Sequence, residues 1–159
     1  MKYYVFNDTD SYGNAEYDIT GEEYLNLMRK CCECTKSFSL YHKDFNTRIY
    51  KELEPYKIKS EIINKNDYQG NNYIEEIAYY SVCSETFDII TTQVKAIFNW
   101  IRGWGYNNPE DPTFYRENGT VFLDSSIHNG VVRMFPINED VSEIIKNELW
   151  RQETVPRLH

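Results

Sequence analysis

Long apolar runs are missing from this 159-residue sequence, in which each run is interrupted after a few residues. A helix needs about 20 predominantly apolar residues to cross the hydrocarbon core of a bilayer. The N-terminal segment becomes acidic at Asp8, which is too early for the apolar core of a signal peptide. We therefore expect no membrane partner, no classical secretion and a cytoplasmic location.

Positive charge is also scarce. Seventeen Lys and Arg residues stand against 25 Asp and Glu, which gives a net charge of −8 and a pI near 4.9. Only residues 29–65 have a positive excess, with nine basic side chains against five acidic ones. A nucleic acid is a polyanion that the overall charge repels, so we expect no nucleic-acid partner. Complementary charge instead favours a basic protein partner.

Internal repeats, low-complexity tracts and interior linkers rich in Gly, Ser or Pro are absent as well, which argues against solenoids and propellers. The length and composition fit one globular domain. We expect this domain to span residues 1–150 and the tail over residues 151–159 to fray.

Alanine is rare, with three residues, whereas 16% of the chain is aromatic, including 14 Tyr and three Trp. Codon usage in an AT-rich genome favours Tyr, Asn, Ile and Lys over Ala and is one explanation. The other explanation is a binding surface, because Tyr and Trp are favoured anchors at interfaces. The two explanations are compatible.

Hydrophobic periodicity predicts both helices and strands. Thr20 and Glu23 have the capping-box spacing and predict the start of a helix, and Asn129-Gly130 predicts a hairpin turn. Helices are expected after Thr20 and over about 45–53, 85–102 and 138–150; strands over 2–6, 15–19, 56–63, 73–82, 119–123 and 131–135. Residues 37–42 fit either a strand or a helical continuation. This order favours an α+β fold, in which an antiparallel sheet of hairpins has about three helices packed on one face.

Three cysteines cluster where the first predicted helix ends. Cys31 and Cys34 have the C-x-x-C spacing of zinc sites and of thiol–disulfide exchange motifs. A zinc site needs four ligands, and only Cys83, His42 or an acid remains to complete it. Cys31 and Cys32 share the apolar stripe, so buried, reduced and metal-free thiols are the simplest interpretation. A metal site at these residues stays an open alternative.

Catalytic and cofactor motifs are also lacking, including G-x-S-x-G, H-E-x-x-H, phosphate-binding loops and G-x-G-x-x-G. We expect no cofactor. Asp124, Ser126 and His128 carry the residue types of a hydrolase triad, but on one strand they point the same way and are more simply a polar solvent face. A small enzyme that uses His128 or His42 beside a carboxylate in a cleft remains an alternative.

Two segments combine acids and aromatic residues with the composition of loops, which often carry function on a rigid scaffold. The candidate partner-binding residues are Asp8, Asp10, Tyr12, Tyr17 and Asp18 in the first segment, and Trp104, Tyr106, Glu110, Asp111 and Tyr115 in the second.

The acidity, the aromatic content and the small size predict a binding protein that inhibits a basic partner. In size, charge and expected fold the chain resembles bacterial immunity proteins, the small antidotes that neutralise toxins such as nucleases. This resemblance implies a protein partner and no catalysis. A phage or structural assembly protein is a further alternative.

Overall fold

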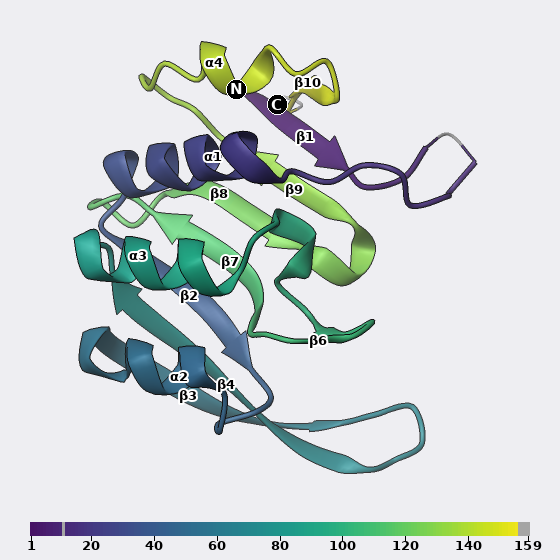
Figure 1. Ribbon diagram of the computed structural model, residues 1–159, viewed down its shortest axis with the longest axis vertical. Helices are drawn as coiled ribbons and strands as arrows, with labels where there is room; N and C mark the ends of the chain where they lie inside the picture. The colour runs from purple at the N-terminus through teal and green to yellow at the C-terminus, as the bar shows by residue number, and fades with distance from the viewer. Residues whose placement is uncertain (11, 156–159) are drawn as a thin grey trace.

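A single eight-stranded antiparallel sheet organises the chain in the computed structural model, which describes residues 1–10 and 12–155 (Figure 1). The strand order is β10-β1-β9-β8-β7-β2-β4-β3. Their bounds are β1 Lys2–Asn7, β2 Ser37–His42, β3 Lys57–Asn66, β4 Asn72–Ser81, β7 Glu110–Tyr115, β8 Val121–Ser126, β9 Val131–Met134 and β10 Trp150–Thr154. A two-stranded ribbon, β5 (Arg102–Gly103) and β6 (Tyr106–Asn107), stands apart from this sheet.

Three helices cross one face of the sheet: α1 (Gly21–Cys34), α2 (Arg48–Leu53) and α3 (Ser84–Gln93) (Figure 1). The short α4 (Ser142–Ile145) lies near β1 and β10 at one edge. The 3-10 turns are η1 (Glu54–Tyr56), η2 (Ile97–Asn99) and η3 (Ile127–Asn129). This arrangement confirms the α+β class and the one-sided helical layer. None of the described helices combines the length and apolarity needed to cross a bilayer, and the longest, α1, has 14 residues.

The core lies between the sheet and the helices. Phe38 on β2 stands between Tyr80 on β4 and Phe114 on β7, with ring centroids 5.4 and 5.6 Å apart. From α1, Tyr24, Leu27, Met28 and Cys31 are buried against this layer, as the apolar stripe predicts. Thr20 occupies the N-cap position of α1, but its side chain makes no capping hydrogen bond, so the predicted capping box does not form.

The helix expected over residues 85–102 is shorter than predicted, because α3 ends at Gln93. Two threonines near its end donate their hydroxyls to carbonyls one turn back, Thr91 to Phe87 and Thr92 to Asp88. Val94 already has an extended backbone, and the N–H of Ile97 bonds to the carbonyl of Ile19. A long-range hydrogen bond therefore replaces the helical one at this position. The predicted apolar positions 90, 94, 97 and 101 are still buried, whereas Phe87 and Phe98 are half-buried.

Two other elements are shorter than predicted, and one strand was not predicted. Residues 15–19 contribute only an isolated bridge, between Thr9 and Ala15, and the helix expected over 138–150 is the single turn α4. Residues 151–154, expected to fray, pair with β1 as β10. Trp150 anchors this strand because its buried ring meets Phe6 edge-on at 5.4 Å. Residues 156–159 lie outside the described part of the chain.

The helices leave the opposite face of the sheet uncovered (Figure 1). Aromatic pairs and charges occupy this face: Tyr3 stacks on Phe135 at 5.4 Å, and the rings of Tyr79 and Tyr115 lie 5.8 Å apart. The hydroxyl of Tyr115 also lies 3.0 Å from that of Ser39.

Candidate functional site

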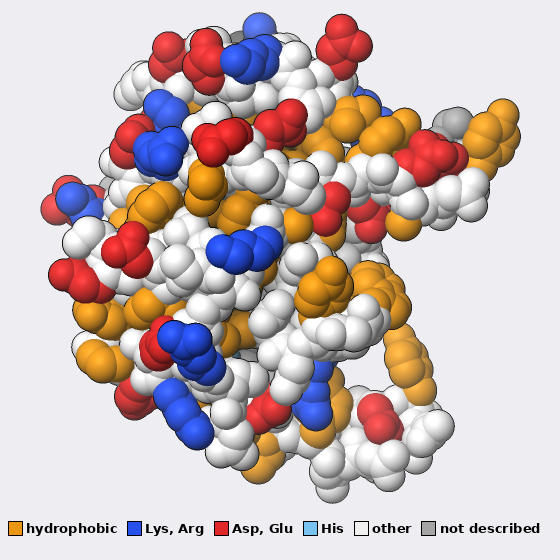
Figure 2. Space-filling model, in the orientation of Figure 1, with side chains coloured by type: hydrophobic (Ala, Val, Ile, Leu, Met, Phe, Trp, Pro, Cys, Tyr) orange, Lys and Arg blue, Asp and Glu red, His pale blue; other side chains and the backbone are white. Residues whose placement is uncertain are grey.

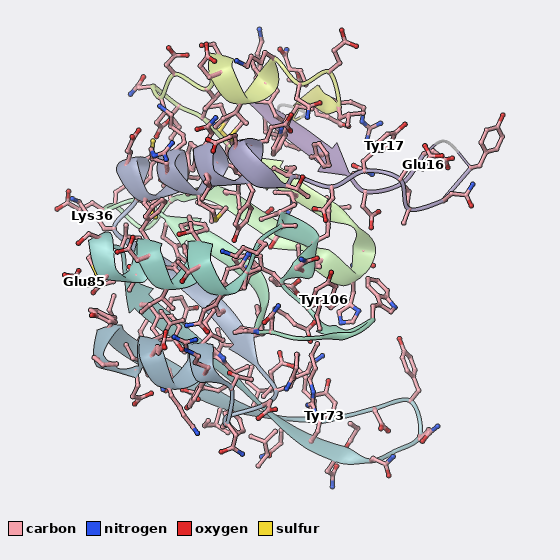
Figure 3. The ribbon with its side chains drawn as sticks, viewed as in Figure 1. Glu16, Tyr17, Lys36, Tyr73, Glu85 and Tyr106 are labelled. Atoms are coloured by element: carbon pink, nitrogen blue, oxygen red, sulfur yellow. The ribbon has the colours of Figure 1, made fainter. Side chains whose placement is uncertain are left out.

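Three chain reversals project from the same end of the sheet (Figure 1). They are the segment over residues 8–18, which we call the acidic arm, the tip of the β5–β6 ribbon and the turn of the β3–β4 hairpin. The surface is hollowed between these projections, and hydrophobic side chains stand out on them (Figure 2). Tyr17 and Glu16 of the arm, Tyr106 of the ribbon and Tyr73 at the base of the hairpin all lie toward this end (Figure 3).

The acidic arm turns around the carboxylate of Asp10. Its Oδ1 accepts the backbone N–H groups of Tyr12 and Asn14, each at 2.9 Å, and these bonds hold its pKa below the ordinary value. The side chain of Tyr12 is 89% exposed at this turn, whereas Tyr17 is half-buried against the core. Of the two tyrosines, Tyr12 is therefore the one available to a partner.

Two further acids of the arm, Asp8 and Asp18, connect the arm to the body of the protein. Asp18 Oδ1 accepts N–H groups from Ile19 at 2.7 Å and from Phe98 at 3.2 Å, and desolvation raises the pKa of its carboxyl. The carboxylate of Asp8 fills the space where a Cβ of Gly130 would stand, within 2.0 Å of that position, and burial raises its pKa. Gly130 also has φ +64°, which favours glycine. Both the lack of space and the backbone conformation therefore require glycine at this position.

The ribbon tip exposes a strained tryptophan. Trp104 has φ +52°, a left-handed conformation that is uncommon outside glycine, and its side chain is 72% exposed. Its ring meets that of His128 edge-on, with the centroids 6.1 Å apart. Tyr106 is exposed on the neighbouring strand.

The β3–β4 turn repeats the arm's geometry, and the sequence-based list of partner-binding residues does not include it. Asp67 Oδ1 accepts the N–H groups of Gln69 and Asn71 at 2.9 and 2.8 Å, and Tyr68 in this turn is fully exposed. The signal is present in the sequence, because Asp-x-x-Gly-Asn occurs at both 10–14 and 67–71. In both turns Asp N–H bonds to the Asn carbonyl at 2.9 Å, and Gly N–H bonds to the Asp carbonyl at 3.1 Å.

The segment expected as a loop over 104–116 is a loop only in its first part. Residues 110–115 form β7, a central strand, so the interpretation of Glu110, Asp111 and Tyr115 as loop residues is wrong. Pro112 suggested a loop because proline lacks the N–H that a ladder needs. The register between β2 and β7 shifts between Ser39 and Tyr41, and β7 pairs with β8 only near its end, so the missing N–H falls at an irregularity.

A polar hollow of about 260 Å³ lies beside the ribbon tip. Its lining residues are Tyr41, Lys43, Lys65, Tyr73, Glu75, Glu110, Asp111 and His128. Glu110 is 3% exposed and lies between two nitrogens: Oε2 is 2.7 Å from His128 Nε2, and Oε1 is 2.9 Å from Lys43 Nζ. On the other side, Lys65 Nζ lies 3.2 Å from Glu75 Oε1. The tertiary structure alone assembles this site, because its residues come from separate strands and turns.

Asp111 enters the hollow in a left-handed conformation, with φ +55°. Its Oδ1 accepts the N–H of Ile127 at 2.8 Å, which fixes the carboxylate against η3. Burial raises the pKa of this carboxyl, and the charge of Glu110 raises it further. Strained residues of this kind gather at functional sites, and Trp104 and Asp111 are the two described non-glycine residues with positive φ.

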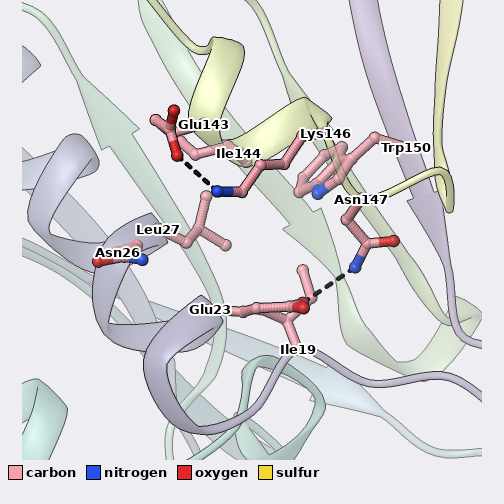
Figure 4. A pocket seen from close by; sticks show the side chains of 9 residues that line it. All are labelled: Ile19, Glu23, Asn26, Leu27, Glu143, Ile144, Lys146, Asn147 and Trp150. Atoms are coloured by element: carbon pink, nitrogen blue, oxygen red, sulfur yellow. Dashed lines mark hydrogen bonds and ion pairs between the residues drawn. The ribbon is translucent and has the colours of Figure 1, made fainter.

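A second hollow, of about 310 Å³, lies between α1 and α4 (Figure 4). Ile19, Leu27, Ile144 and Trp150 supply its apolar part, and four of its polar side chains bond to one another in two pairs. Glu143 pairs with Lys146 at 2.6 Å, and Asn147 donates to Glu23 at 2.9 Å (Figure 4). We assign no function to this hollow.

His42 is inaccessible to a substrate. It is 1% exposed, its Nε2 lies 2.7 Å from the hydroxyl of Tyr80, and its Nδ1 has no hydrogen-bond partner among the described residues. Burial lowers its pKa to about 4, so the ring is neutral near pH 7. The sequence-based alternative of a catalytic His42 is therefore not supported by its position.

The cysteines are free thiols in this structure. Cys31 is buried and Cys32, Cys34 and Cys83 are half-buried; burial raises the pKa of Cys31 well above its ordinary value and that of Cys32 to about 12. Thiols of this kind are protonated and unreactive near neutral pH. Among residues 1–10 and 12–155, no group of three or more His, Cys, Asp or Glu side chains has metal-binding geometry.

Comparisons with protein-family models, curated proteins and solved structures found no match to this chain. The function must therefore be inferred from the geometry of these sites.

Proposed function

We propose that this chain is a cytoplasmic binding protein that inhibits a basic protein partner, in the manner of an immunity protein. The observation that carries the proposal is the exposure of three aromatic rings at one end of the molecule. Tyr12, Tyr68 and Trp104 belong to the acidic arm, the β3–β4 turn and the ribbon tip, and all three side chains are exposed. Aromatic anchors of this type dominate the energetics of many interfaces.

Charge supports a basic partner. The acidic arm contains four acids, Asp8, Asp10, Glu16 and Asp18, and no Lys or Arg, within a chain of net charge −8. Such a field raises the rate at which a basic protein encounters this end. The two Asp-centred turns also fix the backbone that carries these tyrosines before binding, which lowers the entropic cost of association.

The test begins with the basic protein that co-purifies with this chain, whose binding is then measured by surface plasmon resonance. Trp104→Ala and Tyr68→Ala should speed dissociation by tenfold or more, because they remove anchors. Glu16→Lys should slow association and reduce its salt dependence.

Matched controls lie away from this end. Ile137→Ala removes another exposed apolar side chain, and Glu153→Lys reverses a charge on β10, so neither should change the kinetics. The proposal fails if the aromatic variants and these controls bind alike.

The pairing of His128 with Glu110 favours a second candidate, a small enzyme. A carboxylate that orients an exposed histidine is the arrangement of a general base, and His128 is 51% exposed while Glu110 is buried. Among the described residues that line the hollow there is no Ser, Thr or Cys, so this pair would activate water rather than a side chain. Hydrolysis of ester or phosphodiester substrates that His128→Ala abolishes, and Trp104→Ala does not, would establish the enzyme instead.

A further inference from the structure

The polar hollow has more negative than positive groups. Glu75, Glu110 and Asp111 contribute three carboxylates, whereas Lys43 and Lys65 contribute two ammonium groups. Each lysine already lies against one glutamate, at 2.9 and 3.2 Å. Asp111 makes no ion pair among the described residues, since the nearby cations Lys43 and His128 both lie against Glu110.

Hydrogen-bond acceptors in the hollow are also left unused. Lys43 lies close to Glu110 Oε1, but off the direction required for a hydrogen bond, so this buried oxygen accepts none from the described residues. Asp111 uses only Oδ1, in its bond from Ile127 N–H. Buried acceptors without donors are costly, and a ligand that supplies N–H groups relieves that cost.

The tyrosines of the hollow already receive cations on their ring faces. Lys43 Nζ lies 5.9 Å from the ring centroid of Tyr73, and Lys65 Nζ lies 5.8 Å from that of Tyr41. A ring face attracts a planar guanidinium both electrostatically and by stacking. The hollow therefore combines aromatic rings that attract cations, a buried acceptor without a donor and more carboxylates than ammonium groups.

We propose that the polar hollow binds an arginine side chain of the partner. A guanidinium offers five N–H donors in a plane, which suits two neighbouring carboxylates better than the single ammonium of lysine. The strained backbone at Asp111 has a purpose in this arrangement, because it aims a carboxylate into the hollow while Oδ1 stays bonded to η3. This inference deepens the proposed function and rests on it for the source of the arginine.

The test uses the isolated chain and three blocked tripeptides, acetyl-Gly-X-Gly-amide, with X as arginine, lysine or citrulline. Citrulline has nearly the shape of arginine without its charge. In an NMR titration, the arginine peptide should shift the backbone amides around Tyr41, Tyr73 and Ile127. The lysine peptide should bind severalfold more weakly, and the citrulline peptide should cause no saturable shift.

The variant Asp111→Asn removes the negative charge of this side chain and should leave the backbone conformation unchanged. Asparagine also tolerates the left-handed conformation and keeps an Oδ1 acceptor for Ile127 N–H, so the fold should be retained. The arginine peptide should bind about tenfold more weakly to this variant, because a charge-assisted hydrogen bond is lost. Asp124→Asn is the control, since Asp124 on β8 pairs with Arg133 on β9 outside the hollow. If Asp111→Asn lowers the melting temperature, Glu75→Gln serves as the second variant.

The inference is overturned if the arginine peptide causes no saturable shift, if lysine or citrulline binds as well, or if Asp111→Asn and Asp124→Asn weaken binding equally. Its failure is distinguishable from that of the proposed function. A partner whose affinity depends on Trp104 but not on Asp111 leaves the binding protein intact and removes the arginine site. If the arginine peptide binds in the hollow but no basic protein partner is found, the arginine site is retained and the proposed function fails.

Discussion

The indole N–H of Trp100 donates a hydrogen bond to the hydroxyl of Tyr24 across 3.1 Å, although the two residues are 76 positions apart in the chain. Both side chains are almost fully buried, and the Tyr24 hydroxyl in turn bonds to the carbonyl of Ile90 at 3.2 Å. This chain of bonds joins α1, α3 and the segment after η2 inside the core. The polar atoms of two large aromatic side chains are thereby satisfied away from water.

Removing the hydroxyl should destabilise the fold. Tyr24→Phe leaves the buried indole N–H without its acceptor, so we expect the free energy of unfolding to fall by about 1–3 kcal/mol in urea denaturation. Tyr12→Phe removes an exposed hydroxyl and should leave the stability unchanged. Equal stability of the two variants would show that water replaces the lost acceptor.

Ile97 tests whether the predicted apolar stripe contributes to the core despite its changed backbone. Its side chain is fully buried in η2, so Ile97→Ala should cost roughly 2–5 kcal/mol of unfolding free energy. Ile137→Ala, at an exposed position, is the matched control. A melting temperature of Ile97→Ala equal to that of the parent would contradict the packing described above.

The carboxylate of Glu139 should make the folded state less stable at acidic pH. The hydrogen bond from Arg116 lowers its pKa from 4.5 to about 2 in the folded chain. The unfolded chain therefore binds more protons between these values, and the contribution present above about pH 4.5 is lost as the pH falls toward 2. The stability difference between parent and Glu139→Gln should shrink from pH 6 to pH 3, as measured by chemical denaturation. Glu117→Gln, at an exposed neighbour, should show no such change.

The buried ring of His42 should make the stability depend on pH in a second, higher range than Glu139 does. Burial lowers its folded-state pKa from 6.5 to about 4, so the unfolded chain binds a proton that the folded chain refuses between these values. Stability should therefore decrease as the pH falls from about 6.5 to 4. In NMR spectra the His42 ring signals of the folded chain should stay those of the neutral form down to pH 5, whereas the same residue in urea should titrate. Protonation near pH 6.5 in the folded chain would show that the ring is solvated.

Local signals in the sequence determined much of the fold. Thr20 marks the N-cap of α1, Asn129-Gly130 leads from η3 into β9 with Gly130 left-handed, and alternating residues predict the β3–β4 hairpin. These features depend on neighbours in the chain, where side-chain size and backbone preference act directly. The two Asp-x-x-Gly-Asn turns are equally local, and the second could have been found from the first.

Long-range contacts decided the rest. The apolar stripe ending at Ile101 has a helical period, yet the bond from Ile97 N–H to the Ile19 carbonyl and the burial of the same side chains stabilise a non-helical path. Pro112 suggested a loop, yet irregular pairing lets a central strand accommodate it. Periodicity reports which side chains are buried, but not which backbone groups replace the helical hydrogen bonds.

The candidate site likewise has one part that the sequence predicted and one part that only the tertiary structure formed. From the sequence alone, composition and loop signals predicted two acidic, aromatic loops, over residues 8–18 and 104–116, and the structure places the acids of the second on β7 rather than at the ribbon tip. Only the tertiary structure brought Glu110 to His128 and Asp111 to Ile127, because these pairs meet through strand pairing across the sheet. Charge and aromatic character are properties of single residues and can be read along the chain. A hollow is a property of distances between residues, and the packing of the sheet sets those distances.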